Sequence, residues 1–160
     1  MEKKDFSKKK AMIILVAGML FCFAIAAIVF VQQLPKTKDF GTSGKFEVAV
    51  VEEKTREILD LFTNQEYQKI LDEYANKGLK EDAKAEDFAY AAAGLGGELG
   101  KIKEIESISL AEMEKAGITY AVSESKVVYD NITVIFTFSF NEDMEFSGIY
   151  LQEHVEEKEE

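Results

Sequence analysis

The chain has 160 residues and a formal net charge of −11, with one histidine (His154), one cysteine (Cys22) and one proline (Pro35). Five of its 19 basic and two of its 30 acidic residues precede residue 32, so residues 32–160 keep 14 and 28 of them and a formal charge of −14. This charge repels phosphates and anionic lipid headgroups, which argues against nucleic acid as a partner. Because no cysteine follows Cys22, a domain there must rest on its hydrophobic core.

Residues 11–31 are an uncharged run of 21 residues. As a helix the run is about 31 Å long, which predicts a transmembrane segment. Five lysines lie in residues 1–10, so the positive-inside rule predicts a cytoplasmic basic tail there and an extracellular position for the rest of the chain. A cleaved signal peptide is the alternative, but the small residues Ala24 and Ala26 are followed by five more apolar residues, which puts the cleavage site inside the bilayer. We therefore expect a single-pass signal anchor in the cell membrane.

Three segments are predicted after the anchor. Residues 32–46 hold the only proline and two glycines among polar residues, which is typical of a flexible linker. Residues 47–152 are long enough for one extracellular folded unit. Residues 153–160 hold five glutamates and one lysine, so we expect an acidic, disordered tail.

Helical periodicity characterises the first half of the folded unit. Its apolar residues first recur at the spacing of one helical face: Val48, Val51, Ile58, Leu59 and Phe62. Thr63, followed three residues later by Glu66, predicts a capping box that opens a second helix. This helix is expected to end at residues 76–78, and a third helix is predicted over residues 83–99.

After Gly100 the apolar residues alternate with a period of two, which predicts strands over residues 102–110, 118–129, 132–140 and 144–151. Within the second strand, the apolar residues change parity, so a β-bulge is expected between Ser123 and Lys126. Three helices followed by about four antiparallel strands predict an α+β fold, in which the helices cover one side of a curved sheet.

Five short segments carry a resemblance to known domains: Asn64–Tyr67, Gly100–Ile102, Thr119–Val122, Phe138–Phe140 and Phe146–Leu151. On these, residues 51–151 resemble the cone-shaped nuclear-transport-factor-like and cystatin-like domains. They resemble more closely an uncharacterised family of such domains on membrane-anchored surface proteins of Gram-positive bacteria. The resemblance implies a cone-like fold but carries over no catalytic residue, since relatives of this fold include both enzymes and assembly modules.

No catalytic, cofactor-binding or metal-binding residue is predicted. The glycines of Gly94–Gly100 lack the spacing and the preceding strand of a dinucleotide-binding loop, so they are expected to end a helix and to allow close packing. The single histidine lies in the acidic tail, which argues against a Ser-His or Cys-His pair. If the cone holds a pocket, four aromatic sheet residues are expected to line it, and core packing is the alternative for the same residues: Tyr120, Phe136, Phe138 and Tyr150.

These observations predict a membrane-tethered, extracytoplasmic binding or assembly module without enzymatic activity or a cofactor. Its expected partners are the lipid bilayer, through residues 11–31, and an envelope protein or a second copy of the chain. A conjugation or secretion component is a variant of this hypothesis. The alternative is a small-molecule pocket protein, or an isomerase-like or hydrolase-like enzyme that uses tyrosine and carboxylate side chains in the cone.

Overall fold

The computed structural model describes residues 34–95 and 98–155. The chain divides into two units, Met1–Pro35 and Lys36–Glu160, of which the second contains the folded domain. The predicted basic tail (1–10) and transmembrane segment (11–31) lie outside the described residues. Within the described ranges, no helix is long and apolar enough to cross a membrane.

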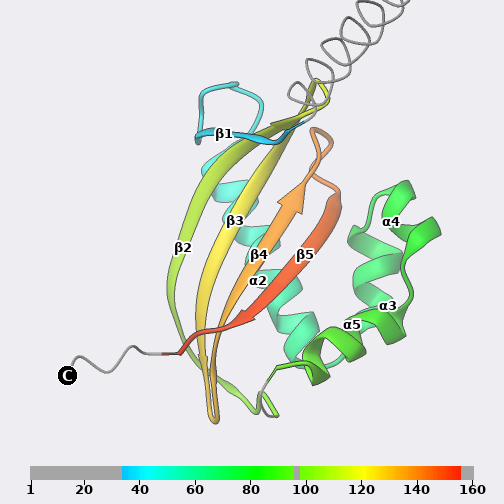
Figure 1. Ribbon diagram of the computed structural model, residues 1–160, viewed down its shortest axis with the longest axis vertical. Helices are drawn as coiled ribbons and strands as arrows, with labels where there is room; N and C mark the ends of the chain where they lie inside the picture. Colours follow the sequence, from blue (N-terminus) through cyan, green and yellow to red (C-terminus); the bar gives the residue numbers. More distant parts are fainter. Residues whose placement is uncertain (1–33, 96–97, 156–160) are drawn as a thin grey trace, which may run out of the picture. The chain divides into compact units, whose positions relative to one another are not determined.

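The domain is built on a five-stranded antiparallel sheet whose strands lie in chain order (Figure 1). The strands are β1 (Lys36–Asp39), β2 (Ile102–Lys115), β3 (Ile118–Tyr129), β4 (Thr133–Phe140) and β5 (Phe146–Glu153). Ala116 and Gly117 join β2 to β3 with φ values of 52° and 80°, the left-handed backbone that suits a two-residue hairpin turn. The predicted α+β class is confirmed, and β1 is a strand that the sequence did not predict.

The predicted flexible linker, residues 32–46, is wrong from residue 36 onward. Residues 36–39 form β1, which pairs with one end of β2. Phe46, at the other end of the predicted linker, is buried in the core. This segment is therefore part of the folded domain.

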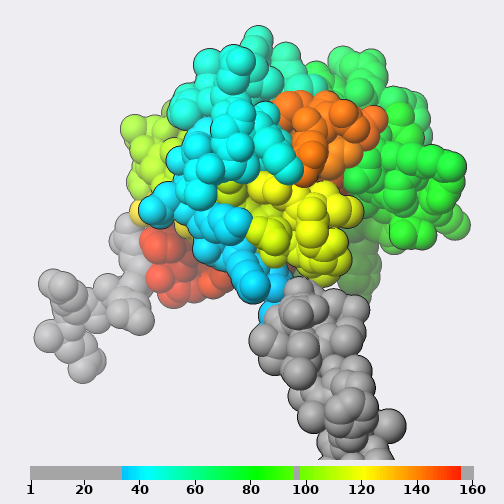
Figure 2. Space-filling model, turned by 90° about the horizontal axis from the view of Figure 1, so that it is seen from above, coloured from blue at the N-terminus to red at the C-terminus, as the bar shows by residue number. Residues whose placement is uncertain are grey.

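A buried carboxylate holds the loop between β1 and Phe46. Glu112 of β2 is fully buried and accepts hydrogen bonds from the backbone N–H groups of Gly41 (3.0 Å) and Ser43 (2.9 Å). A buried charge is costly unless it is hydrogen-bonded, so the loop and Glu112 stabilise each other. Lys45, which ends the loop, pairs with Glu142 of the β4–β5 turn at 2.6 Å. Figure 2 shows this loop lying over the ends of the two hairpins.

The helical part consists of α2 (Val48–Thr63), α3 (Tyr67–Lys69), a π-helical turn η1 (Ile70–Tyr74), α4 (Lys77–Asp82) and α5 (Ala85–Ala93). The first two predicted helices correspond to α2 and to α3 with η1. The third, predicted over 83–99, is shorter and ends at Ala93, because Gly94 caps it.

Two residues at predicted helix ends, Thr63 and Asn76, have roles that differ from the prediction. The predicted capping box is absent, because the Thr63 hydroxyl donates to the carbonyl of Leu59 (2.8 Å) instead of capping α3. The side chain of Asn76 accepts a hydrogen bond from the N–H of Leu79 (2.8 Å) and so starts α4, where the sequence predicted only the end of a helix.

Aromatic side chains join the sheet to α2. Along β4, buried and half-buried residues alternate strictly, so only one face of the strand is covered. On that face, Phe136 meets Phe62 of α2 edge to face, with ring centroids 5.4 Å apart, and Phe138 meets Phe146 of β5 at 5.8 Å. Figure 1 shows α2 running along this face. The core-packing interpretation of Phe136 and Phe138 is confirmed.

The predicted bulge in β3 is wrong. β3 pairs with β4 without a register shift from Ala121, opposite Phe140, to Val128, opposite Thr133. The buried side chains keep one parity along the whole strand: Thr119, Ala121, Ser123, Ser125, Val127 and Tyr129. The inward residues of β3 are therefore small or polar in its first part and large and apolar at its end. In the sequence, this change looks like a shift of the apolar residues from one parity to the other. Register shifts lie instead in β2 and at the start of β5.

Phe138→Ala is expected to lower the free energy of unfolding by about 3–5 kcal/mol, because a fully buried aromatic side chain loses both transfer energy and packing. Thr137→Ala, on the uncovered face of the same strand, is the control and should cost less than about 0.5 kcal/mol. Thermal unfolding of the full-length chain measures both. Equal midpoints for the two variants would place Phe138 outside the core.

Candidate functional site

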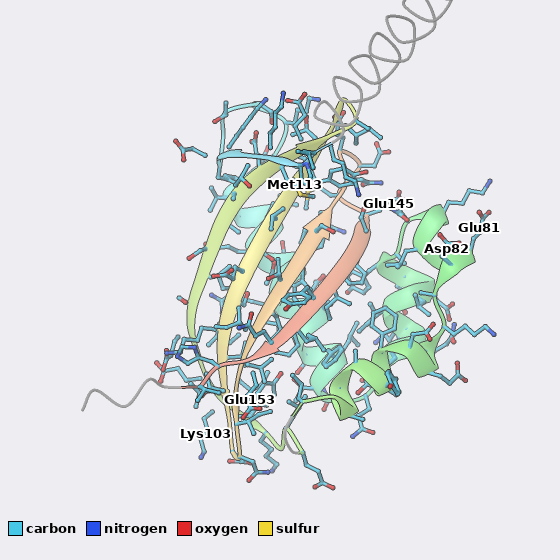
Figure 3. All side chains as sticks on the ribbon, viewed as in Figure 1. Glu81, Asp82, Lys103, Met113, Glu145 and Glu153 are labelled. Atoms are coloured by element: carbon cyan, nitrogen blue, oxygen red, sulfur yellow. The ribbon has the colours of Figure 1, made fainter. Side chains whose placement is uncertain are left out.

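The sheet face that turns away from α2 is called here the outer face. Residues that are directly paired in an antiparallel sheet share a face, so Tyr150 of β5, which pairs with Thr137, belongs to it. Tyr150 is 63% exposed. Tyr120 also belongs to this face and pairs with Met113 of β2. Figure 3 shows Met113 at one end of β2 and Lys103 at the other. The outer face includes Met113, Tyr120, Val122, Glu124, Thr133, Ile135, Thr137, Ser139 and Tyr150.

The four aromatic residues predicted to line a cone pocket lie on opposite faces of the sheet. Phe136 and Phe138 are fully buried in the core. Tyr120 and Tyr150 lie on the outer face. The structure therefore does not bring the four together around one space, and none of them lines the pocket described below.

A bulge in β5 explains the position of Tyr150. Phe146 pairs with Phe140, but the next pair is Gly148 with Ser139, so β5 holds one extra residue at this point. Every later side chain of β5 is thereby moved to the other face. Counting by two from Phe146 would place Tyr150 in the core, whereas the bulge turns it outward.

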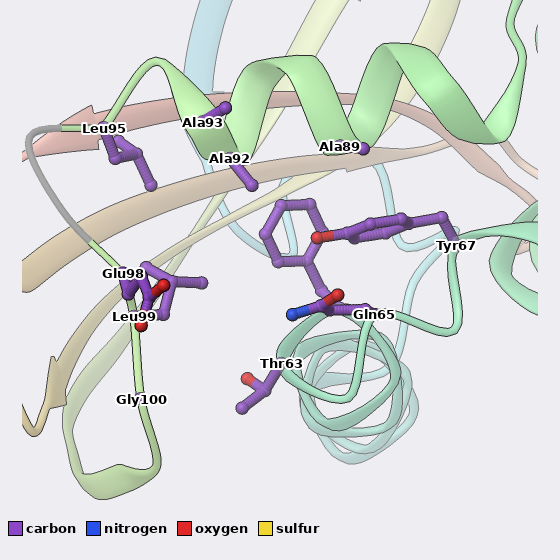
Figure 4. Close-up of a pocket in the computed structure, with 11 residues that line it drawn as sticks. Thr63, Gln65, Tyr67, Ala89, Ala92, Ala93, Leu95, Glu98, Leu99 and Gly100 are labelled. Carbon is purple, nitrogen blue, oxygen red and sulfur yellow. The ribbon is translucent and has the colours of Figure 1, made fainter.

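A pocket of about 780 Å³ lies where the end of α2, α3, α5 and residues 98–100 meet (Figure 4). Three alanines of α5 form part of its wall, and their short side chains leave the space open. The lining residues are Phe62, Thr63, Gln65, Tyr67, Ala89, Ala92, Ala93, Leu95, Glu98, Leu99 and Gly100.

One wall of the pocket is aromatic. The ring of Tyr67 meets Phe62 edge to face (centroids 5.1 Å apart) and stacks on Phe88 at 6.2 Å with an interplanar angle of 13°. Burial raises the pKa of the Tyr67 hydroxyl above its ordinary value of 10.0, so it remains a neutral donor and acceptor near pH 7. Gln65, at a φ of 62°, turns the chain between α2 and α3, a conformation that non-glycine residues rarely adopt.

The facing wall is held in place by the β3–β4 turn. Gly100 has a φ of 75°, and a Cβ at this position would lie 2.9 Å from the Cβ of Asp130. The carboxylate of Asp130 accepts a hydrogen bond from the N–H of Lys101 (3.0 Å). The side chain of Asn131 donates to the carbonyl of Glu98 (3.0 Å). Because of these contacts, the backbone that carries Glu98 has a defined position beside the pocket.

The predicted role of the glycine run is confirmed at two positions. Gly94 ends α5, and Gly100 permits the close approach to Asp130. Gly96 and Gly97 lie outside the described residues.

The predicted disordered tail, 153–160, is wrong at its start. Glu153 is the last residue of β5, and the N–H of His154 donates to the carbonyl of Thr133 at 2.8 Å, which extends the pairing with β4. Residues 156–160 lie outside the described ranges. Within those ranges, no three His, Cys, Asp or Glu side chains are grouped so that they could hold a metal ion.

Thr63, at the edge of the pocket, connects it to the core. Its hydroxyl donates to the carbonyl of Leu59, so the hydroxyl of Tyr129, 3.0 Å away, donates to Thr63. Burial raises the pKa of Tyr129 to about 12.

A family model described as "Protein of unknown function (DUF3887)" matches residues 55–149. The chain belongs to this family. The match extends from within α2 to within β5, so it includes most of the core, most of the outer face and the whole pocket. No curated protein and no solved structure matches the chain. The predicted membership of an uncharacterised family is thus confirmed for the DUF3887 domain.

The sequence predicted a pocket lined by sheet residues, but the pocket of the DUF3887 domain lies among the helices and residues 98–100. Sequence reasoning gives Gln65, Tyr67 and Ala92 no role in a pocket. A local signal exists in the three consecutive alanines Ala91–Ala93, which leave space beside a helix. The space becomes a pocket only because the segment after α5 packs on the β3–β4 turn, and this contact is not visible in the sequence.

Tyr129 of the DUF3887 domain should titrate at a higher pH than an ordinary tyrosine and give a late step of its own. Its pKa of about 12 in the folded chain exceeds the ordinary value of 10.0. The stability that this difference contributes is therefore fully present below pH 10 and is lost as the pH rises through 12. Ultraviolet absorbance followed against pH measures this late step, and Tyr129→Phe should remove it. If that step persists in the variant, the assignment to Tyr129 is wrong.

Proposed function

We propose that this DUF3887 protein is a membrane-tethered, extracytoplasmic and non-enzymatic module that binds an envelope protein through its outer sheet face. The observation that carries the proposal is the one-sided burial of the sheet. Every second residue of β4 is buried and every other one is only half-buried, and Tyr150 on the neighbouring strand is 63% exposed. Tyrosine is enriched at protein interfaces because its ring offers apolar area and its hydroxyl a hydrogen bond.

The tether rests on the sequence. The uncharged run of 21 residues at 11–31 is long enough to span a bilayer, and the five lysines before it favour a cytoplasmic N-terminus. The charge of −14 on residues 32–160 keeps this part soluble and away from anionic headgroups. The partner is therefore expected to be more basic than the domain, since the centre of the outer face itself carries Glu124, which pairs with Thr137.

A cone-shaped fold of the nuclear-transport-factor-like or cystatin-like type belongs to the same proposal. The support is a curved meander sheet with α2 along one face and the short helices α3 to α5 after it. Such folds serve both enzymes and assembly modules, so the fold does not choose between them. A role as a component of a conjugation or secretion apparatus is the more specific form of the assembly proposal.

The enzyme alternative is less well supported than the binding module. It required tyrosine and carboxylate side chains that meet inside the cone, but Tyr120 and Tyr150 lie on the outer face. The pocket at α5 does combine Tyr67 with Glu98. However, Glu98 is exposed to solvent, whereas a general base in a small-molecule enzyme is commonly tuned by burial.

The test is crosslinking of the full-length chain in its native membrane, followed by identification of the attached protein. Thr133→Lys, Thr137→Lys and Ser139→Lys in one chain should abolish the crosslinked product, because three lysines place charge in the centre of the outer face. The control, Glu81→Lys with Asp82→Asn, changes the net charge by the same amount on α4 (Figure 3) and should keep the product. A product that survives the outer-face variant, or that is lost equally in the control, would contradict the proposal.

A further inference from the structure

We propose that the pocket between α2, α3 and α5 binds a small organic molecule with an apolar body and a cationic, ammonium-type head. This inference is independent of the partner-binding proposal, because the pocket residues come from the helices and residues 98–100, and none of them lies on the outer face.

The size and lining of the pocket fit a small ligand. Its volume of about 780 Å³ falls within the roughly 300–1,000 Å³ of small-molecule sites. The ring of Tyr67, Leu95 and Leu99 supply apolar surface, and the short side chains of the α5 alanines leave the volume open. A leucine or phenylalanine at Ala92 would fill much of it. The helix thus presents small side chains where the rest of the domain packs large ones.

Three polar side chains reach the pocket from two sides. Figure 4 shows Gln65 and Tyr67 on one side and Glu98 on the other. None of the hydrogen bonds between described residues uses the amide of Gln65, the hydroxyl of Tyr67 or the carboxylate of Glu98. These groups are therefore available to a ligand, as acceptors at all three positions and as donors at Gln65 and Tyr67.

The charge of the pocket selects the head group. Glu98 is the one acidic side chain among the lining residues, and none of those residues is basic. Lys103, on the strand that follows, is engaged with Asp130 through a hydrogen bond to its carbonyl (3.2 Å) and an ion pair (3.7 Å). A carboxylate or phosphate head would thus meet repulsion without a compensating cation. An ammonium head is attracted by Glu98 and by the ring of Tyr67, whereas Phe62 is fully buried behind that ring.

Two probes of the same shape test the head-group preference: phenethylamine and 3-phenylpropionate. The full-length chain is labelled at its alanine methyl groups and kept in detergent micelles, and methyl NMR signals report binding at Ala89, Ala92 and Ala93. Phenethylamine should shift these signals and should bind about tenfold more tightly than 3-phenylpropionate, because Glu98 attracts one head and repels the other.

Three variants distinguish binding of the probe in the pocket from partition of the probe into the micelle. Glu98→Gln should reduce the preference to about twofold or less, while Glu104→Gln, an equal charge change at an exposed position of β2, should keep it. Ala92→Phe should abolish the methyl shifts. Equal affinity for the two probes, no shift with either probe, or a preference that survives Glu98→Gln would overturn the proposal. Each of these results leaves the crosslinking test of the outer face unaffected.

Discussion

The contact between Phe62 of α2 and the aromatic side chains of β4 and β5 joins the two layers of the domain. Phe136 and Phe138 project from β4 toward α2, and Phe146 meets Phe138 from β5. All four rings are fully buried. Since one helix covers only one face of the sheet, the same contact that forms the core leaves the outer face uncovered. The candidate interaction surface is thus a consequence of how the core is built.

The same core also positions the pocket. Phe62 belongs at once to the core, where it meets Phe136, and to the pocket, where it meets Tyr67. A substitution at Phe62 would therefore damage the fold and the pocket together. Residues that line the pocket without entering the core, such as Ala92 and Glu98, separate the two effects, because neither is fully buried.

Sequence periodicity predicts the parts of the fold that depend on local pattern. The alternation along β4 correctly predicts Phe136 and Phe138 as core, and the apolar spacing after Val48 correctly predicts α2. The glycines after α5 correctly predict that a helix terminates there, although α5 ends at Ala93 and not at the predicted residue 99. In each case, the side chain pattern within one segment decides the result.

The parts that could not be predicted depend on contacts between distant segments. The loop after β1 looks like a linker until Glu112, about 70 residues later, accepts hydrogen bonds from two of its N–H groups. One extra residue at the start of β5 turns Tyr150 to the outer face. The pocket requires Gly100 to approach Asp130. Gly100 precedes β2 and Asp130 follows β3, so the two residues are distant in the sequence. No local spacing reveals such contacts.

The central claim, that a partner covers the outer face, is tested most directly by nitration of tyrosine in purified chain and in intact cells. Tyr150 is 63% exposed and Tyr90, on α5, is 83% exposed, so both should react in the purified full-length chain. In cells, Tyr150 should react several times more slowly while Tyr90 keeps its rate, as mass spectrometry of the modified peptides would measure. Equal rates for Tyr150 in the two preparations would contradict the claim that a partner occupies the outer face.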